Sequence, residues 1–218
     1  MKERGARYST GGLTVSAVIP AFNEEKTIVE VVRGALAHVN EVTVVDDGST
    51  DNTAVAATEA GATVIRHENN MGILAAVARG LKEAKGDILV TLDADGQHDP
   101  SDIPRLIKPI LEDRADLVLG RRRSFPHFSE RLITVLTRMK VNCTDASTGF
   151  RAIRRSIAEL MRLHGSCLCG TFILEAHRLG ARIAEVPITI QERRGGGRRL
   201  KTRHLKQILY VIYDLARL

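Results

Sequence analysis

The sequence predicts one domain of the α/β class, with a mostly parallel sheet flanked by helices. Short, almost wholly apolar runs alternate with segments of helical spacing through the first half of the chain. Polar or acidic clusters follow several of these runs, as expected where strands of such a sheet end beside a ligand. The chain has 218 residues, enough for one sizeable core, and 44% are hydrophobic. We therefore expect one globular domain with a binding site at one edge of its sheet.

Alternating strands and helices account for the first half. The apolar run that begins at Val15 is expected to be a buried strand closed by Pro20. Gly61 is expected to end the second helix, and Asp99 or Ser101 to cap the fourth. The expected strands are 15–19, 42–45, 62–65, 88–92 and 116–119, and the expected helices are 26–37, 52–60, 72–84 and a fourth that opens at Pro100.

The second half is less regular. Helical spacing recurs at 129–140, 156–163 and 171–179, and strand-forming residues at 182–190 are interrupted by Pro187. Residues 145–150 are expected to form a loop. We divide the chain into a polar leader at 1–12, a main domain at 13–200 and a C-terminal amphipathic helix at 201–218. The apolar stripe of that helix comprises Leu205, Ile208, Leu209, Ile212 and Leu215.

Positive charge is concentrated in one segment. The chain has 32 basic and 26 acidic residues, a formal net charge of +6. Residues 193–206 include five Arg, two Lys and no acid, which leaves the rest of the chain at −1. A nucleic-acid-binding protein would usually spread such charge over a docking face. We therefore expect one local anionic partner and no nucleic acid.

Cysteine use and hydropathy favour a cytoplasmic protein. There are three cysteines, an odd number, and residues 1–12 lack the apolar core of a signal sequence. Cys167 and Cys169, with His164 nearby, match no common zinc spacing. No run approaches the ~20 apolar residues of a spanning helix. Any membrane contact is therefore expected to be peripheral.

Segment 92–98 is the most informative. Asp93 and Asp95, two residues apart at the end of an expected strand, can face one cation, and Gln97 adds a neutral oxygen. Oxygen ligands of this kind suit Mg²⁺ or Mn²⁺ ions that share their coordination shell with phosphate. A polar turn with side-chain-to-backbone hydrogen bonds is the plainer alternative. The position of the pair directly after a strand favours the metal site.

Two further acidic positions follow strands. Asp47, beside Gly48, can accept hydrogen bonds from a ribose or a base, although a capped strand-to-helix turn explains the same residue. Glu24 lies in the first turn of an expected helix, where the helix dipole alone favours an acid. No G-x-G-x-x-G follows the first strand, which argues against a dinucleotide cofactor.

Arginines supply the complementary charge. Arg121, Arg122, Arg123 and the run at 193–206 carry guanidinium groups that suit phosphate and diphosphate. Three consecutive glycines within that run would let a loop close over an anion. A solvated charged surface is the alternative, but the local concentration of charge favours anion binding.

Six motifs occur in a characteristic order along the chain. They are Pro20-Ala21-Phe22-Asn23-Glu24, Asp46-Asp47-Gly48-Ser49, Asn69-Asn70-Met71-Gly72, Asp93-Ala94-Asp95-Gly96-Gln97-His98, Gly120-Arg121-Arg122 and Asp145-Ala146-Ser147-Thr148-Gly149-Phe150. Together they resemble the family-2 glycosyltransferases of GT-A fold, and within them the dolichyl-phosphate mannose synthase-like, or polyprenyl-phosphate glycosyltransferase, branch. The resemblance covers most of the chain, from about residue 15 to residue 200.

The resemblance implies a metal-dependent, inverting glycosyltransferase that uses a nucleotide-sugar donor. Asp93, Asp95 and Gln97 would hold Mg²⁺ or Mn²⁺ against the diphosphate of a GDP- or UDP-linked sugar. Arg122 would meet the donor sugar or phosphate, and Asp145 would lie on the acceptor side. The implied catalytic set is Asp93, Asp95, Arg122 and Asp145. The implied donor-binding residues are Pro20, Phe22, Glu24, Val45, Asp47, Asp93, Asp95, Arg193 and Arg199.

The implied acceptor is a polyprenyl or dolichyl phosphate, and the implied sugar is a hexose of the mannose or glucose type. Because a phosphate oxygen is already anionic, Asp145 would position this acceptor rather than deprotonate it; with a hydroxyl acceptor it becomes a candidate base. One alternative is a glycosyltransferase of the same fold that acts on a sugar hydroxyl. Others are a nucleotidyltransferase, which would usually have a glycine- and lysine-rich loop after the first strand, and a binding domain without turnover.

A lipid acceptor implies peripheral docking on the cytoplasmic face of a membrane. The apolar stripe of the C-terminal helix begins beside basic residues, an arrangement typical of an interfacial helix on anionic lipid. The helix at 129–140 would provide a second contact. Packing of both helices on the core is the alternative. The basic residues are Lys201, Arg203, His204 and Lys206, and the apolar residues of the second helix are Leu132, Ile133, Val135, Leu136 and Met139.

Overall fold

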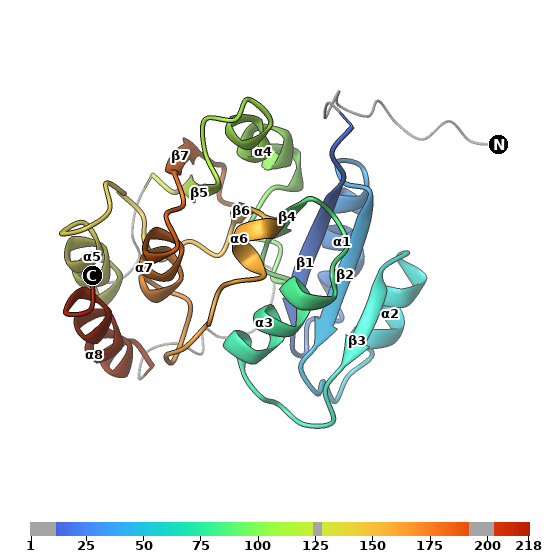
Figure 1. Cartoon of the computed structure of the whole chain (residues 1–218). Coiled ribbons are helices and arrows are strands. Elements are labelled where there is room, and N and C mark those ends of the chain that lie inside the picture. Colours follow the sequence, from blue (N-terminus) through green and yellow to red (C-terminus); the bar gives the residue numbers. More distant parts are fainter. Residues whose placement is uncertain (1–11, 124–127, 192–202) are drawn as a thin grey trace.

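The computed structural model describes residues 12–123, 128–191 and 203–218 (Figure 1). Its strands are β1 (Val15–Ala21), β2 (Glu41–Asp46), β3 (Thr63–Arg66), β4 (Ile88–Thr91), β5 (Leu117–Arg121), β6 (Arg151–Arg154) and β7 (Ile183–Pro187). Its helices are α1 (Ile28–Leu36), α2 (Thr53–Glu59), α3 (Ile73–Glu83), α4 (Ile103–Leu111), α5 (Phe128–Thr137), α6 (Arg155–Ala158), α7 (Thr171–Arg178) and α8 (Arg203–Leu215), with a 3₁₀ turn at Pro100–Asp102.

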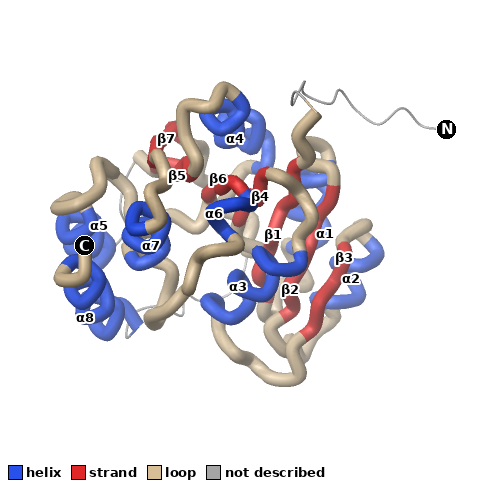
Figure 2. The backbone as a smooth tube through the Cα atoms, in the orientation of Figure 1, coloured by secondary structure: helices blue, strands red, loops and turns tan. Residues whose placement is uncertain are grey.

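The described strands form one mixed sheet in the order β3-β2-β1-β4-β6-β5-β7 (Figure 2). Strand β6 runs antiparallel to both of its neighbours, while the other pairings are parallel. The predicted α/β class, with a mostly parallel sheet flanked by helices, is therefore confirmed. The polar segments that follow β1, β2 and β4 meet at the carboxyl edge of the sheet.

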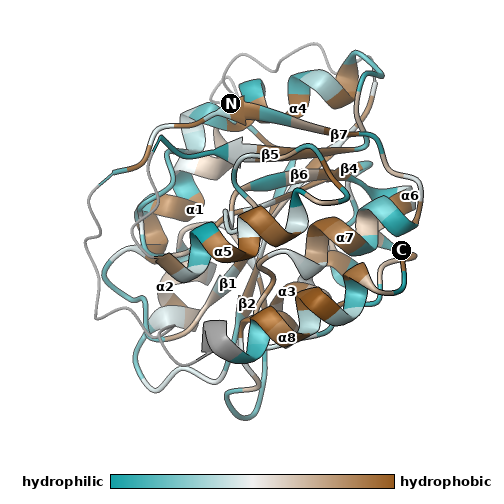
Figure 3. Cartoon of the chain, turned by 90° about the vertical axis from the view of Figure 1, so that its left-hand side faces the viewer, coloured by the Kyte–Doolittle hydropathy of each residue, from teal (hydrophilic) through white to brown (hydrophobic). Residues whose placement is uncertain are grey.

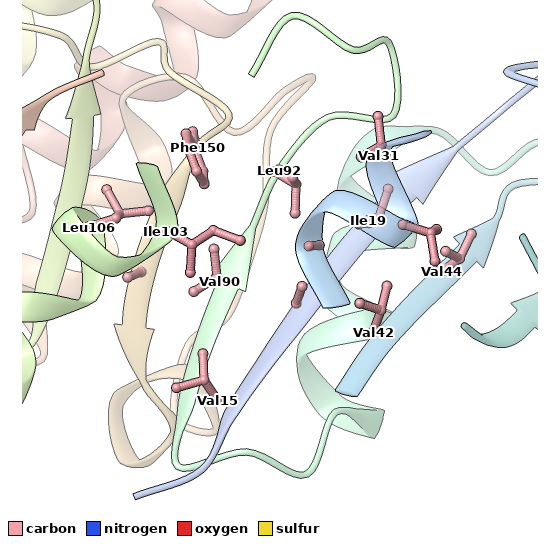
Figure 4. Close-up of a cluster of buried hydrophobic side chains, with 14 of the residues drawn as sticks. Val15, Ile19, Val31, Val42, Val44, Val90, Leu92, Ile103, Leu106 and Phe150 are labelled. Atoms are coloured by element: carbon pink, nitrogen blue, oxygen red, sulfur yellow. The ribbon is translucent and has the colours of Figure 1, made fainter. Parts of the chain in front are cut away.

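Two apolar clusters pack on opposite faces of this sheet. Because side chains alternate along a strand, Ile88 and Val90 of β4 belong to one cluster and Leu89 to the other. The first cluster, drawn in Figure 4, is covered by α1, α2 and α4. The second is covered by α3, α5, α6, α7 and α8. This burial on both faces explains why the strands read as continuous apolar runs.

Pro20 does not close the first strand as predicted, because β1 continues to Ala21. The reason is the alternation of backbone directions in a parallel strand. Val18 accepts a hydrogen bond from Leu92 on the β4 side, and Ala21 accepts one from Asp47 on the β2 side. The ring nitrogen of Pro20 faces the β4 side, where pairing has already ended at Val18. Proline has no N–H, but at this position no residue of β4 would accept a hydrogen bond from it, so no bond between the strands is lost.

The second half differs more from the prediction. Residues 151–154, which had no predicted strand, form the reversed strand β6. The helix predicted at 156–163 is only the short α6, and the following chain is held on α7 by Arg162, whose N–H donates to Glu175 at 3.1 Å. The predicted cap is confirmed at Asp99, which accepts the N–H of Ser101 at 2.9 Å.

The C-terminal helix packs on the domain through one side. Val211 is fully buried, and Ile208 and Leu215 are partly buried against the second apolar cluster. Leu209 and Ile212 are exposed on the other side. The predicted stripe is therefore divided between the core and the surface; the side chain of Leu205 lies outside the described residues, as does most of the predicted leader.

Candidate active site

A pocket of about 360 Å³ opens where the loops after β1, β2 and β4 meet the chain around β6. One wall carries the acidic and polar residues that the sequence singled out. The second wall comes from the loop before β6, from β6 itself and from the segment before α7. The first wall includes Pro20, Phe22, Glu24, Asp47, Asp93, Asp95 and Gln97, and the second includes Ser147, Thr148, Gly149, Arg151, Cys167, Leu168 and Cys169.

The turn after β4 presents its carboxylates to the pocket. Asp95 Oδ1 accepts the N–H of Gln97 at 3.1 Å, which shapes the turn, and the Asp93 side chain is 44% exposed. Asp93 N donates to Nδ1 of His98 at 3.3 Å. A Cβ on Gly149 would lie 2.5 Å from Asp93 Oδ2, so only glycine lets the loop before β6 approach this closely. Asp93, Asp95 and Gln97 thus meet in one turn, as predicted.

His98 helps to fix the conformation of this turn. The imidazole is buried and lies 5.2 Å from the ring of Phe150, measured between centroids. Burial lowers the pKa of His98 more than the neighbouring carboxylates raise it. The neutral ring can therefore accept the N–H of Asp93 at Nδ1. This role is structural, since His98 does not line the pocket.

The donor set fits a divalent ion shared with a substrate. Two carboxylates and one amide oxygen from a single turn are hard oxygen ligands, which suit Mg²⁺ or Mn²⁺. Among the residues that the structure describes, no group of three or more His, Cys, Asp or Glu side chains is arranged to hold an ion. An ion at Asp93 and Asp95 would therefore complete its shell with substrate oxygens and water.

Asp47 lines the pocket, but its carboxylate is already bound. Oδ1 accepts from the N–H of Met71 at 2.9 Å and contacts His67 Nδ1 at 2.8 Å, while Oδ2 accepts from the N–H of Gly72 at 2.7 Å. The residue therefore shapes the loop before α3, which contributes Asn70 to the pocket. Met71 and Gly72 belong to the Asn-Asn-Met-Gly motif, but the spacing of that motif does not indicate that its N–H groups bind Asp47.

The loops after β1 and β2 hold each other. Asn23 has a positive φ of 54°, and its N–H donates to Ser49 Oγ at 2.9 Å. Its Oδ1 accepts the N–H of Thr50 at 2.8 Å. Asparagine tolerates this left-handed conformation better than most residues, which explains its place before Glu24. Val45, expected beside the nucleoside, is instead fully buried and does not line the pocket.

Arg122 and Asp145 are brought together, but behind the pocket wall rather than in it. Arg122 donates from Nε and Nη2 to the two Asp145 oxygens at 2.7 and 2.8 Å, and it also pairs with Glu130 at 3.1 Å. Burial alone would lower the pKa of Arg122, but the hydrogen bonds and charge of Asp145 reverse this and raise it. Asp145 also accepts the N–H of Ser147 at 3.1 Å, so the pair fixes the acceptor-side loop.

Sequence reasoning missed part of the second wall. Arg151 directly follows the predicted acceptor loop, but the loop motif ends at Phe150 and gives no signal for the next residue. Cys167 and Cys169 match no common zinc spacing, and that spacing does not indicate that they flank Leu168 in the pocket lining. The predicted phosphate-binding residues Arg193 and Arg199 lie outside the described residues.

The fold and the acidic pocket together define an α/β transferase of the GT-A class. Comparison with known proteins then gives the family: the model of glycosyl transferase family 2 matches residues 16–161. The chain belongs to this family.

Several relatives carry descriptive names. A UDP-N-acetylglucosamine–dolichyl-phosphate N-acetylglucosaminyltransferase of Methanococcus voltae is 33% identical, with 78% of this chain and 83% of that protein covered. A dolichol-phosphate mannosyltransferase of Pyrococcus furiosus is 32% identical, with 93% of this chain and 64% of that protein covered. The structure of glucosyl-3-phosphoglycerate synthase from Mycobacterium tuberculosis with Mn²⁺, UDP and glucosyl-3-phosphoglycerate matches with a TM-score of 0.81 at 27% identity, covering 96% of this chain and 82% of that one.

Proposed function

We propose that this glycosyltransferase moves a hexose from a nucleotide-diphospho-sugar to the phosphate of a polyprenyl or dolichyl lipid, with inversion at the anomeric carbon. The observation that carries the proposal is the cluster Asp93, Asp95 and Gln97 in one pocket with Glu24 and Asp47. This arrangement suits a cation and a nucleoside diphosphate. The names of the relatives from Methanococcus voltae and Pyrococcus furiosus support a lipid-phosphate acceptor.

The donor site is assigned by position along the first wall. Pro20, Phe22 and Glu24 would contact the nucleoside, with Asp47 holding the loop beside it. Asp93, Asp95 and Gln97 would hold Mg²⁺ or Mn²⁺, which when bound would stabilise the leaving diphosphate as a Lewis acid. The arginines at 193–199 would add charge to the same anion. The Mn²⁺ and UDP in the Mycobacterium tuberculosis structure support this division.

The state of Asp145 favours an acceptor that needs no base. Its carboxylate is fully buried and accepts hydrogen bonds from Arg122 and Ser147, so it is poorly placed to remove a proton. A phosphate monoester oxygen already carries negative charge and attacks without deprotonation. The alternative is an enzyme of the same fold that acts on a hydroxyl acceptor, and the glucosyl-3-phosphoglycerate bound in the matched structure supports it.

A lipid acceptor requires access to a membrane surface, for which α5 and α8 offer a face. In the described residues, no helix is long and apolar enough to cross a bilayer. Ile133 and Thr137 of α5 face the core, whereas Val135 and the nearby Met139 are exposed on the outer side. On α8, Val211 faces the core, and the outer side carries exposed apolar or aromatic residues. These are Leu209, Ile212 and Tyr213.

Charge around this face suits anionic lipid. Figure 3 shows α5 and α8 on the side of the molecule toward the viewer, with apolar residues in both helices, and the two helices are in contact. Exposed basic residues lie on each helix or just after its last residue: Arg131, Arg138, Lys206 and Arg217. Apolar side chains flanked by cations are typical of interfacial helices. We propose peripheral docking of this face on the cytoplasmic side of a membrane.

A transfer assay tests the acceptor. UDP- and GDP-linked hexoses are incubated with Mn²⁺, the protein and either undecaprenyl phosphate or geranyl phosphate, and the glycolipid is measured. Thermal-shift measurements with UDP and GDP select the donor, because a bound nucleotide raises the melting temperature by mass action. Transfer to a sugar hydroxyl, with none to either lipid phosphate, would replace the proposal with the alternative.

Flotation with liposomes containing anionic lipid tests the membrane face. The wild type is expected to float with the vesicles at low salt and less so at high salt. Replacing Leu209 and Ile212 together by Glu should abolish flotation, because both exposed side chains would place charge in the apolar layer. The matched control is Val55→Glu on α2, an exposed valine at the other end of the molecule (Figure 1). Flotation of both variants like the wild type would contradict docking through α8.

A further inference from the structure

The second wall of the pocket contains a buried cation that lacks a counter-ion among the described residues. Arg151 is only 1% exposed, yet it lines the pocket. Its Nε and Nη1 atoms are buried and have no hydrogen-bond partner among the described residues, and Nη2 donates to the Leu168 carbonyl at a long 3.4 Å. A buried guanidinium is normally paired with a carboxylate, because an unpaired buried charge is costly.

The surroundings of Arg151 hold the group in place without neutralising it. Its guanidinium carbon lies 4.6 Å from the centre of the Phe172 ring, which fixes the plane of the side chain. Asp145, a nearby acid, is already engaged by Arg122 at 2.7 Å. Burial lowers the pKa of Arg151, and the charges of Cys169, Asp93 and other nearby groups oppose this shift only in part.

Arg151 lies on the strand next to the turn that contains Asp93, and its Nη2 reaches the Leu168 carbonyl in the segment before α7. Arg151 pairs with Thr91 in the β4–β6 register, two residues before Asp93. Thr91 in turn donates from Oγ1 to the Gly149 carbonyl at 2.8 Å, which ties the loop before β6 to β4. A ligand bound between the turn at Asp93 and the Cys167 segment would therefore meet a cation beside the proposed metal site.

We infer that Arg151 binds the anionic phosphate of the acceptor and holds it beside the proposed donor site. This inference rests on the proposed function, since it assigns a site for the second substrate. A phosphate monoester would supply the acceptor oxygens that Nε and Nη1 lack. The shared chemistry is a monophosphate, whether it belongs to a lipid headgroup or to a small phosphorylated metabolite such as 3-phosphoglycerate.

Binding measurements on charge variants test the inference. Titration calorimetry with geranyl phosphate, with 3-phosphoglycerate and with uncharged geraniol is carried out on the UDP- and Mn²⁺-bound protein. Arg151→Met, which keeps the length but removes the charge, is expected to weaken binding of the preferred monophosphate at least tenfold and to leave UDP affinity unchanged. The affinity of Arg151→Lys for the monophosphate is expected to lie between the affinities of the wild type and Arg151→Met. Equal monophosphate affinity in wild type and Arg151→Met would overturn the inference.

Stability separates this role from a structural one. If the charge serves a ligand, Arg151→Met should melt at the same temperature as the wild type or higher, because an unpaired buried cation is removed. The control is Arg154→Met on the same strand, which loses hydrogen bonds to Asp113 and Asp116 and should bind phosphate normally. A lower melting temperature for Arg151→Met than for Arg154→Met would overturn the inference.

The two phosphate sources give different outcomes. Arg151-dependent binding of geranyl phosphate supports the lipid acceptor together with the inference. Arg151-dependent binding of 3-phosphoglycerate alone keeps the anion site but removes the proposed lipid acceptor. Binding of neither compound, in a protein that still binds UDP and Mn²⁺, overturns the inference.

Discussion

The two walls of the pocket treat charge in opposite ways. The first wall, built after parallel strands and here called the donor wall, presents the carboxylates of Asp93 and Asp95 to the pocket. The second wall, built around the reversed strand β6 and here called the acceptor wall, contains the buried Arg151, which has no ion-pair partner in the described chain; Arg122, behind that wall, is bound by two carboxylates. One wall therefore offers negative charge to a cation, and the other offers positive charge to an anion. Both proposed substrates are anions, so the difference suggests two ways to bind phosphate: the donor diphosphate through a metal ion held by carboxylates, and the acceptor phosphate directly by a guanidinium group.

The largest effect is expected on the donor wall. Asp95→Asn keeps an oxygen for the N–H of Gln97, so the fold should remain, but it removes one charge from the proposed metal site. The transfer rate should fall about 100-fold or more, the scale of losing one preorganised electrostatic contact. Rates with Mn²⁺ and circular dichroism of the folded variant check this. Full activity of the wild type in excess EDTA would contradict a metal requirement.

A second large effect is expected behind the acceptor wall. Arg122→Met would leave Asp145 and Glu130 buried without their cation, and breaking such a pair costs about 3–5 kcal/mol of unfolding free energy. Urea denaturation measures the loss. Arg79→Met, which breaks only an exposed pair with Glu83, should cost less than about 1 kcal/mol.

A double variant sharpens this contrast between the buried and exposed pairs. Arg122→Met combined with Asp145→Asn should recover part of the lost stability, because one stranded carboxylate is then neutral. If Arg122→Met costs no more than Arg79→Met, the buried cluster does not hold the acceptor loop in place.

Asp47→Ala tests the donor wall more gently. The variant frees the N–H groups of Met71 and Gly72, so the loop beside the proposed nucleoside site should loosen. Nucleotide affinity is expected to fall by roughly 1–3 kcal/mol, the cost of losing hydrogen bonds to a charged group. Calorimetry with UDP and GDP provides the measurement. Unchanged affinity for both nucleotides would show that Asp47 serves the turn alone.

The sequence predicts the first wall of the pocket better than the second. Apolar runs such as 42–45 and 88–92 identified the parallel strands, because strands buried on both faces need apolar side chains throughout. The residues after those strands then located the donor wall, including Asp93 and Asp47. Strand β6 escaped notice because its sequence, Arg-Ala-Ile-Arg, begins and ends with charge. The ion-pair partners of Arg154, Asp113 and Asp116, are distant along the chain, and Arg151 has no ion-pair partner among the described residues. Local spacing therefore indicates neither arrangement.

The smallest effect concerns the edge where β5 and β7 begin. Hydrogen bonds from Arg182 hold the pKa of Asp116 down at about 2, below its ordinary value of 3.8. Since the folded pKa is the lower one, this stabilisation is complete above pH 3.8 and is lost as the pH falls toward 2. Asp116→Asn should cost about 1 kcal/mol near neutral pH. Urea midpoints at neutral and acidic pH should differ less in the variant than in the wild type.

Gln207 makes the C-terminal helix inseparable from the pocket. Its fully buried amide accepts the N–H groups of Ser166 and Cys167 at 2.8 and 3.0 Å, and donates to the Cys169 carbonyl at 2.7 Å and to Thr171 Oγ1 at 3.0 Å. The amide oxygen and the amide nitrogen of this one side chain on α8 therefore each make two hydrogen bonds to the segment before α7 and the start of that helix. Helix and wall should open as one cooperative unit in hydrogen exchange. A shortened enzyme without α8 would therefore lose the support of the second wall of its pocket along with the exposed apolar side of that helix.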